Sequence, residues 1–417
     1  MRRVVVTGIG TINSTGHNVK DSFKAVVDGV CGIDTITLFD ASEFSVKIAG
    51  EVKDFDPTTV MDKKEVKKAD RFIQLGIKAA LEAMIDSGYV TQEDKKVDAS
   101  IADRFGMISG SGIGGLSTIE RNSIVCETKG SRKVSPFFIP SSLANMLSGF
   151  ISIEHNLRGP SLSHVTACAA STHALNDAVK TIMIGGADRI LVVGAESAIC
   201  AAGVAGFAAM KALSTRNDEP KKSSRPFDID RDGFVMGEGA GALVVEDLEI
   251  ALARGAKIYA EIIGFGESGD ANHITTPVMD GPLRAMEAAF EMAKNITGEY
   301  PKIDYINAHG TSTPVGDKNE TAAIKALFDG GDVPLVSSTK GQIGHCLGAA
   351  GAIEAIFTIK ALEEGIIPPT INIDNQDPEC DLDYIANVAR KANLTTVMSN
   401  NFGFGGTNGS VIFKRYE

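Results

Sequence analysis

Residues 165–173 read V-T-A-C-A-A-S-T-H, an apolar, strand-like run that stops at Cys168 and continues as small residues that favour a helix. A cysteine at such a junction has two interpretations. It buries well as a small apolar side chain, or it uses the helix N-terminus, which lowers the pKa of a thiol and points free N–H groups at whatever the thiol attacks. Position alone favours the first interpretation, because buried cysteines are common. The rest of the chain has to decide between them.

The sequence on either side of this stretch alternates between strand-like and helix-like segments. Helical periodicity covers residues 72–85 and 173–184. Short runs with the composition of buried strands cover residues 2–8, 104–110, 163–168, 189–195 and 241–247. Strands that alternate with helices at this spacing predict an α/β fold with mostly parallel, buried strands.

The second half of the chain repeats this plan in the same order. Four of its segments match segments of the first half. Residues 257–268 match the first strand, and residues 303–312 match residues 104–112. Residues 335–359 match the strand, turn and helix around Cys168, and residues 402–415 match residues 233–247. We therefore expect a duplicated α/β unit, with one half over residues 1–255 and the other over residues 256–417. Such a duplication brings equivalent strand-end loops together, and ligands bind outside the carboxyl ends of parallel strands.

The composition excludes several classes of protein. A chain of 417 residues with 43% hydrophobic and 23% charged residues is ordinary for a globular protein and too long for one simple core. No run of about 18 apolar residues is present, so no membrane span is expected, and the N-terminus does not resemble a secretory signal. The net charge of −12 argues against general nucleic-acid binding. Six cysteines without C-x-x-C spacing argue against zinc and disulfides, which favours the cytoplasm, or the plastid matrix if a transit peptide has been removed.

Two histidines and a lysine lie in the strand-end loops of the second half. His309 follows one expected strand, and Lys340, His345 and Glu354 follow the next. A single loop histidine is more often structural, but two of the seven histidines in these loops, matched with Cys168 in the other half, favour a catalytic site. A cysteine with two histidines allows covalent acyl chemistry. The thiolate attacks a thioester, and imidazole N–H groups stabilise negative charge on a carbonyl oxygen.

Four ordered motifs carry a resemblance to a known family: V-T-A-C-A-A-S, N-A-H-G-T-S-T-P-V-G-D, S-T-K-G-Q-I-G-H-C-L-G-A-A-G-A-I-E and N-F-G-F-G-G-T-N. They resemble the β-ketoacyl-acyl-carrier-protein synthases of the elongating type, in the thiolase superfamily, and the synthase II group most closely. The likeness covers essentially the whole chain, including residues 156–163 and 224–241. It implies a thiolase fold, in which duplicated mixed-sheet α/β units form a layered αβαβα arrangement.

The resemblance implies an acyltransferase that performs decarboxylative Claisen condensation in fatty acid elongation. Cys168 would take the acyl chain from acyl carrier protein. His309 and His345 would bind the thioester carbonyl of the malonyl unit, promote its decarboxylation and stabilise the enolate. Lys340 would hold this network together with Glu354, more by charge and position than by proton transfer.

The resemblance also implies roles for residues around these groups. The backbone N–H groups of Cys168 and Phe404 would form an oxyanion hole, and Phe404, in its glycine-flanked loop, would gate the passage between acyl pocket and malonyl site. Asp317, in the His309 loop, would be a supporting residue. The implied substrate-binding residues are Thr311 and Thr313 near the phosphopantetheine arm, Ile113 and Phe207 along the acyl pocket, and Thr275 in a loop beside the gate.

The implied partners are acyl carrier protein, loaded with acyl or malonyl groups, and a second copy of the chain, with residues 163–167 at the homodimer interface. Phosphopantetheine arrives on the carrier, so the resemblance implies no metal and no cofactor. Basic spots on an acidic protein suit a small acidic partner. The docking candidates are Lys64, Lys67 and Lys68, expected on one side of a helix, with Arg132, Lys133 and Lys211.

Several alternatives remain beside this hypothesis. A polyketide-type ketosynthase would share the chemistry but use a different carrier and acyl chain. The intact Cys168 argues against a non-catalytic chain-length partner subunit. The segment G-S-G-I-G-G (110–115) matches a dinucleotide-binding pattern, but no ribose-binding acid stands at the required distance, so we expect a tight turn beside the acyl pocket. Cys346 stands where the family often has threonine, and we expect it to be buried and silent.

Overall fold

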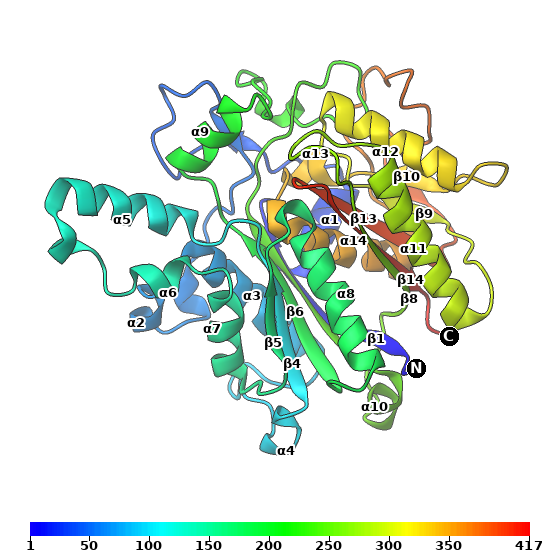
Figure 1. Cartoon of the computed structure of the whole chain (residues 1–417), viewed down its shortest axis with the longest axis horizontal. Coiled ribbons are helices and arrows are strands. Elements are labelled where there is room, and N and C mark those ends of the chain that lie inside the picture. The colour runs from blue at the N-terminus through cyan, green and yellow to red at the C-terminus, as the bar shows by residue number, and fades with distance from the viewer.

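Ten strands pair into one mixed sheet in the computed structural model, which describes residues 1–417 (Figure 1). The strands are β1 (Val4–Asn13), β4 (Phe105–Gly110), β5 (Ser161–His164), β6 (Arg189–Glu196), β7 (Gly239–Asp247), β8 (Ala260–Gly269), β9 (Tyr305–Asn307), β10 (Leu335–Ser337), β13 (Thr396–Gly403) and β14 (Thr407–Lys414). Two short ribbons lie outside this sheet: β2 (Asp34–Thr35) with β3 (Ile48–Ala49), and β11 (Ile366–Ile367) with β12 (Arg390–Lys391).

The sheet consists of two halves with the same strand order. One half runs β5-β4-β6-β7-β1 and the other β10-β9-β13-β14-β8, and they join where Val4–Val6 pairs with Ala260–Ile262. In each half the first three strands are parallel, and the remaining pairs are antiparallel. This arrangement confirms the duplicated mixed-sheet unit. The expectation of mostly parallel strands is wrong, because β14 returns directly from β13 and β7 pairs antiparallel with both of its neighbours.

Helices complete five layers around and between the halves. α3 (Arg71–Asp86) and α7 (Met146–His155) cover the outer face of the first half, and α11 (Asp280–Thr297) and α12 (Pro314–Leu327) cover that of the second. Between them lie α8 (Ala170–Met183) and α14 (Ala350–Glu364), which contact each other and strands of both halves. The layered αβαβα thiolase fold is therefore confirmed.

The central helices are apolar because they are covered on all sides. The largest core cluster includes Ala174 and Val179 of α8, Ile353 and Phe357 of α14, and strand residues from both halves. Burying this apolar surface provides the main driving force that holds the halves together. The strand ends of both halves are thereby held at one edge of the shared core.

The remaining helices lie mostly in insertions around the sheet. They are α1 (Val19–Val27), α2 (Lys63–Val66), α4 (Ala99–Ala102), α5 (Leu116–Lys129), α6 (Phe138–Ser142), α9 (Ala201–Ala209), α10 (Leu248–Ala253) and α13 (Lys340–Ile343). Figure 1 shows α5 extending away from the body of the molecule. No helix is both long enough and apolar enough to pass through a bilayer.

The strand expected over residues 163–168 is shorter than its apolar composition suggested. β5 ends at His164, and a 3-10 turn over Ala167–Ala169 leads into α8. Ala167 has a φ of 50°, in the left-handed region that residues other than glycine rarely adopt. The chain thus reverses sharply at Cys168 instead of continuing straight from strand to helix.

Candidate active site

The sharp turn at Cys168 has a counterpart in the second half. There a 3-10 turn over Leu347–Ala349 leads into α14, and Leu347 has a φ of 47°, close to the 50° of Ala167. Gly348 occupies the position that corresponds to Cys168. Strained backbone of this kind persists where the surrounding structure holds it, and it is common at functional sites. The turn presents the Cys168 thiol at the N-terminal end of α8.

One cavity of about 380 Å³ brings the candidate residues of both halves together. Cys168 comes from the first half, and His309, His345 and Phe404 come from the second. Its walls include further candidates from the sequence: Phe207, Lys211, Thr275, Thr311 and Thr313. The loops of the two halves therefore meet, as the predicted duplication requires. This placement favours a reactive Cys168 over a cysteine that serves only as a buried apolar side chain.

The two histidines face each other within this cavity. Their ring centroids are 5.3 Å apart and their planes are inclined by 85°. The Nδ1 atom of each ring is buried without a hydrogen-bond partner. Burial, and then the positive charge of Lys340, lower the pKa of both imidazoles well below the ordinary value. Both rings are therefore neutral at pH 7, so each carries one N–H that can donate.

Lys340 and Glu354 form a completely buried ion pair beneath the cavity. The Lys340 ammonium bonds to Oε1 of Glu354, and neither side chain is exposed. Asn401 donates to Oε2 of Glu354 at 2.7 Å and accepts from the Thr172 hydroxyl at 2.7 Å. Burial raises the pKa of Glu354, and the charge of Lys340 opposes that rise. This network joins α8, α14 and β13, and it holds a fixed positive charge behind the histidines.

The resting thiol of Cys168 is protonated. Burial raises its pKa to about 12, although the charge of Lys340 acts in the opposite direction. Burial is the largest influence on this thiol, and it acts against the lowering expected from a helix N-terminus. The backbone N–H of Phe404 also acts to lower the pKa of the thiol.

Phe404 lies in the turn of a β-hairpin. β13 ends at Gly403 and β14 begins at Thr407, while Gly405 and Gly406 adopt φ values of 86° and 68°. The N–H of Gly405 donates to the carbonyl of Ile274 at 2.7 Å, so this turn contacts the loop that carries Thr275. The Phe404 ring is 6.5 Å from that of Phe207 across the cavity. Its role as a gate stays a prediction.

Two further sequence candidates, Ile113 and Asp317, lie outside the cavity wall. Ile113 packs on an apolar cluster that contains Cys168 but does not line the cavity itself. Asp317, in the first turn of α12, is fully buried and accepts from the backbone N–H of Phe227 at 2.8 Å. Burial raises the pKa of Asp317 to about 6, and its partner Arg231, 3.3 Å away, opposes that rise. Both residues support the site from behind.

Sequence reasoning missed Glu320, which holds the backbone of the His309 loop. Its carboxylate accepts from the N–H groups of His309 and Gly310, each at 2.8 Å. Burial raises the pKa of Glu320 to about 7. The only signal in the sequence was its spacing, because Glu320 follows Asp317 by three residues and so lies on the same side of α12.

The glycine-rich segment 110–115 encloses the buried carboxylate of Glu196, which sequence reasoning also missed. Five donors contact that carboxylate: Ser111 Oγ at 3.0 Å and the N–H groups of Gly112, Ile113, Gly114 and Gly348 at 2.6, 3.2, 3.2 and 3.0 Å. Successive backbone N–H groups make an anion-binding concavity, and the chain fills it with its own side chain. The expected tight turn is confirmed by the φ of 73° at Gly114.

The lysines expected on one helical side do not share a helix. α2 ends at Val66 and α3 begins at Arg71, because Asp70 caps α3 by accepting from the N–H of Phe72. That single-face prediction is wrong. Lys64 and Lys67 are exposed, and Lys68 bonds to Glu65 at 2.6 Å and lies over the ring of Phe137.

The other docking candidates and Cys346 are also placed by the structure. Arg132 and Lys133 are exposed in a 3-10 turn after α5, and exposed Lys211 lines the cavity directly. Cys346 is completely buried, with its sulfur 3.6 Å from the carbonyl of Glu238, as expected of a silent position.

Comparison with known families decides what this site belongs to. The model of the β-ketoacyl synthase N-terminal domain matches residues 1–251, and that of the C-terminal domain matches residues 259–374. The chain belongs to the β-ketoacyl synthase family. It is 50% identical over 418 residues to 3-oxoacyl-[acyl-carrier-protein] synthase 2 of Vibrio harveyi, covering 99% of each chain. The resemblance seen in the motifs is confirmed, and the protein is an acyltransferase.

Solved structures of this family share the fold along the whole chain. A β-ketoacyl synthase from Burkholderia phymatum STM815 superposes with a TM-score of 0.91 at 36% identity, covering 100% of both chains. The structure AntDE:AntF, a type II polyketide acyl-carrier protein in complex with its ketosynthase, superposes with a TM-score of 0.87 at 29% identity, again covering 100% of both chains. Of these two structures, the Burkholderia phymatum synthase is the more similar in sequence.

Proposed function

We propose that this β-ketoacyl synthase is a 3-oxoacyl-acyl-carrier-protein synthase II, which extends acyl chains by two carbons in fatty acid elongation. One observation carries the proposal: a single cavity holds a cysteine thiol and two neutral imidazoles above a buried lysine. The similarity to synthase 2 of Vibrio harveyi supports the choice of reaction within the family.

The first step is a thiol exchange. Cys168 Sγ attacks the carbonyl carbon of an acyl thioester on acyl carrier protein, and the bond from that carbon to the phosphopantetheine sulfur breaks. The proton of the Cys168 thiol passes to the departing phosphopantetheine thiolate, so no external base is consumed. The backbone N–H groups of Phe404 and Cys168 stabilise the tetrahedral oxyanion.

The second step forms the new carbon–carbon bond. Malonyl carrier protein places its thioester oxygen against His309 and His345, whose N–H groups donate to the enolate oxygen that forms as carbon dioxide leaves. The enolate carbon attacks the acyl carbon on Cys168, and the Cys168 sulfur leaves as a thiolate that takes up one proton. The products are 3-ketoacyl carrier protein, carbon dioxide and the free thiol. Neither step draws on a metal or an organic cofactor.

The pH profile of decarboxylation tests the protonation state of the histidines. Because burial and Lys340 lower both pKa values below the ordinary value of 6.5, protonation should not begin until the pH falls below that value. We expect the rate of carbon dioxide release from malonyl carrier protein to stay level from pH 8 down to pH 6.5. A rate that is half-maximal at pH 6.5 would show ordinary imidazoles, and circular dichroism across the range controls for unfolding.

The carrier protein belongs to the same proposal. The polyketide ketosynthase that resembles this chain is seen in complex with an acyl-carrier protein. Exposed Lys211 at the cavity, with the basic residues near α2 and α6, offers positive charge to an acidic partner. A cytoplasmic location is also part of the proposal, because all six cysteines are free.

We further propose a homodimer that pairs two copies of β5. β5 is the edge of the sheet and exposes Leu162, and the adjacent Val165 is 57% exposed. An edge strand with exposed apolar side chains is a template for pairing with another chain. We expect Leu162→Lys to convert a dimer in light scattering into a monomer, while Ile184→Lys, at another exposed site, leaves the dimer intact. A monomeric unaltered protein would contradict the pairing.

The polyketide-type ketosynthase remains the second candidate, because a ketosynthase of that type shares the fold. Intact-protein mass spectrometry separates the two functions. The protein is mixed with fatty acyl carrier proteins of increasing chain length, then with malonyl carrier protein. An acyl mass on Cys168 that disappears as a 3-ketoacyl product forms supports the elongation synthase. A protein that accepts no fatty acyl chain would overturn this function in favour of a polyketide carrier or a partner subunit.

A further inference from the structure

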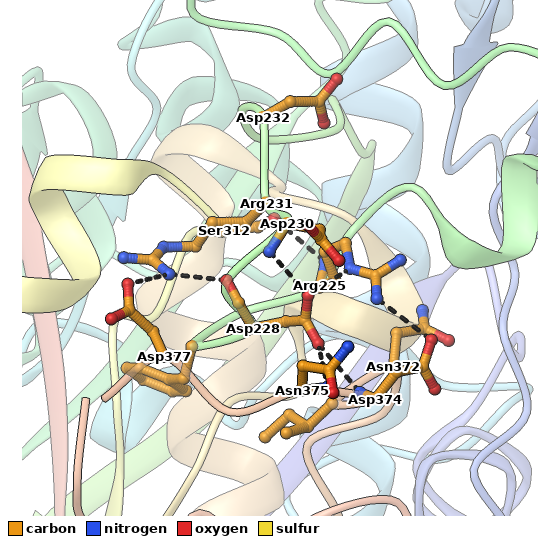
Figure 2. Close-up of polar contacts among 12 residues, drawn as sticks. Arg225, Asp228, Asp230, Arg231, Asp232, Ser312, Asn372, Asp374, Asn375 and Asp377 are labelled. Carbon is orange, nitrogen blue, oxygen red and sulfur yellow. Dashed lines mark hydrogen bonds and ion pairs between the residues drawn. The ribbon is translucent and has the colours of Figure 1, made fainter. Parts of the chain in front are cut away.

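A buried arginine, Arg231, lies behind the loop that carries His309. Its side chain is 1% exposed, and none of the reaction steps above uses it. Figure 2 shows Arg231 in a cluster of charged residues, in which Arg231 and Arg225 lie among several aspartates that include Asp228. A buried guanidinium has to be fully bonded to be tolerated, so its partners define what it holds in place.

Arg231 bonds to three separate segments of the chain. Its Nε donates to the carbonyl of Thr313 at 3.1 Å, and its Nη2 donates to the carbonyl of Pro314 at 2.9 Å. Its Nη1 donates to the carbonyl of Asp228 at 2.6 Å and to the carboxylate of Asp377 at 2.9 Å. The planar fork of one guanidinium thus clamps the start of α12 to the loop of Arg231 itself and to the C-terminal segment.

The clamped segment is strained. Ser312, directly before Thr313, has a φ of 67°, in the left-handed region. Two further contacts keep it there, because its hydroxyl accepts from the N–H of Arg225 at 3.0 Å and its carbonyl accepts from the N–H of Gly233 at 3.1 Å. Strained backbone returns to ordinary geometry when its restraints are removed.

This strain positions polar groups in the cavity. Thr311 and Thr313, on either side of Ser312, both line the cavity, and their hydroxyl oxygens are 3.0 Å apart. Any thioester arm that enters the cavity from this wall meets these hydroxyls. A shift of the Ser312 backbone moves both of them together.

The loop that carries Arg231 is itself anchored. Asp228 is completely buried, and its carboxylate accepts from Arg225 at 2.9 Å and from the N–H groups of Asp374 and Asn375 at 2.9 and 2.8 Å. Figure 2 shows these contacts on the side of Asp228 away from Arg231. The clamp therefore rests on a fixed base and not on a mobile loop.

We propose that Arg231 is a positioning residue for the carrier-arm wall of the cavity, and that it acts through the strained turn at Ser312. The inference rests on the proposed function, because it concerns how the thioester arm is received. Lysine at this position keeps the charge beside Asp377 but cannot reach both carbonyls, since an ammonium lacks the planar fork. The expected consequence is weaker binding of the arm and unchanged reactivity of the thiol.

The test compares Arg231→Lys with a matched control, Arg254→Lys. Arg254 also joins a buried carboxylate, Glu246, and a backbone carbonyl, but it follows α10 at the opposite end of the sheet. For each variant, the KM and kcat of Cys168 acylation by acyl carrier protein are measured, with the rate of Cys168 alkylation by iodoacetamide. We expect Arg231→Lys to raise KM about tenfold, as the loss of two hydroxyl contacts would, with kcat and alkylation within about twofold of the unaltered protein.

Each outcome decides one statement. A purely structural role lowers the amount of folded protein, and so lowers kcat and leaves KM unchanged, which would overturn the inference. A rise in KM of the same size in Arg254→Lys would also overturn it. If the unaltered protein accepts no acyl group from the carrier, the proposed function fails and the positioning role fails with it, whereas acylation with an unchanged KM in Arg231→Lys removes the positioning role alone.

Discussion

Cys168→Ala is expected to lower the rate of condensation by about 1,000-fold or more, because it removes the atom that carries the acyl chain. The same variant should still release carbon dioxide from malonyl carrier protein. In the proposed mechanism the donors for the enolate are His309 and His345, and the buried Lys340–Glu354 pair sets their charge environment. Loss of one activity with retention of the other separates the nucleophile from the decarboxylation site.

The measurement follows both products in one experiment. Carbon dioxide release and 3-ketoacyl carrier protein are quantified for the unaltered protein and for Cys168→Ala. Cys346→Ala serves as the control, since it removes a buried thiol next to His345 in the chain and leaves the proposed nucleophile in place. Retained condensation in Cys168→Ala would exclude the covalent mechanism, and loss of decarboxylation there would show that the thiol takes part in both steps.

Lys340→Met is expected to lower the free energy of unfolding by about 3–5 kcal/mol at pH 7, because it leaves Glu354 charged and unpaired in the protein interior. Without the lysine, only the hydrogen bond from Asn401 opposes the rise that burial causes in the pKa of Glu354. At pH values between the unfolded and the folded pKa, the folded state therefore holds a proton that the unfolded state lacks. The loss of stability is therefore largest at pH values above the pKa of Glu354 in the folded state, and it shrinks as the pH falls through that pKa. Urea unfolding at pH 7 and pH 5 measures both effects.

The double variant Lys340→Met with Glu354→Gln gives the matched control. It removes both charges, and a neutral buried pair costs much less than one orphaned charge, so part of the stability should return. Asn401 can still bond to the glutamine side chain by rotating its amide. If the double variant were less stable than Lys340→Met, the cost would lie in packing and not in the unpaired carboxylate.

Much of the fold and the site could be predicted from the sequence, because both depend on short-range patterns. Apolar runs identified β1, β4, β6 and β7, and the order of motifs in the second half predicted the matching strands. Cysteine and histidine are rare enough at strand ends to be noticed individually. Their placement in one cavity followed from the duplication alone.

The remaining features depend on contacts between distant residues, which single-chain patterns do not carry. Glu196 and Arg231 looked like ordinary charged residues until the fold surrounded them with backbone donors and acceptors. The pKa of Cys168 depends mainly on its burial in the folded protein, which its position before a helix does not reveal. The break between α2 and α3 depended on one capping bond at Asp70.

The correspondence between Cys168 and Gly348 shows that the two copies of the repeat are no longer equivalent. A side chain at Gly348 would place its Cβ 2.1 Å from the backbone nitrogen of Gly112, so the second copy has no room for a nucleophile of its own. The first copy in turn supplies neither of the facing imidazoles. Each copy is therefore half of an active site. A chain with two first halves would have two thiols and no facing imidazoles, and a chain with two second halves would have two imidazole pairs and no thiol to acylate. Because the two halves have diverged since the duplication, a complete active site forms only where both halves meet.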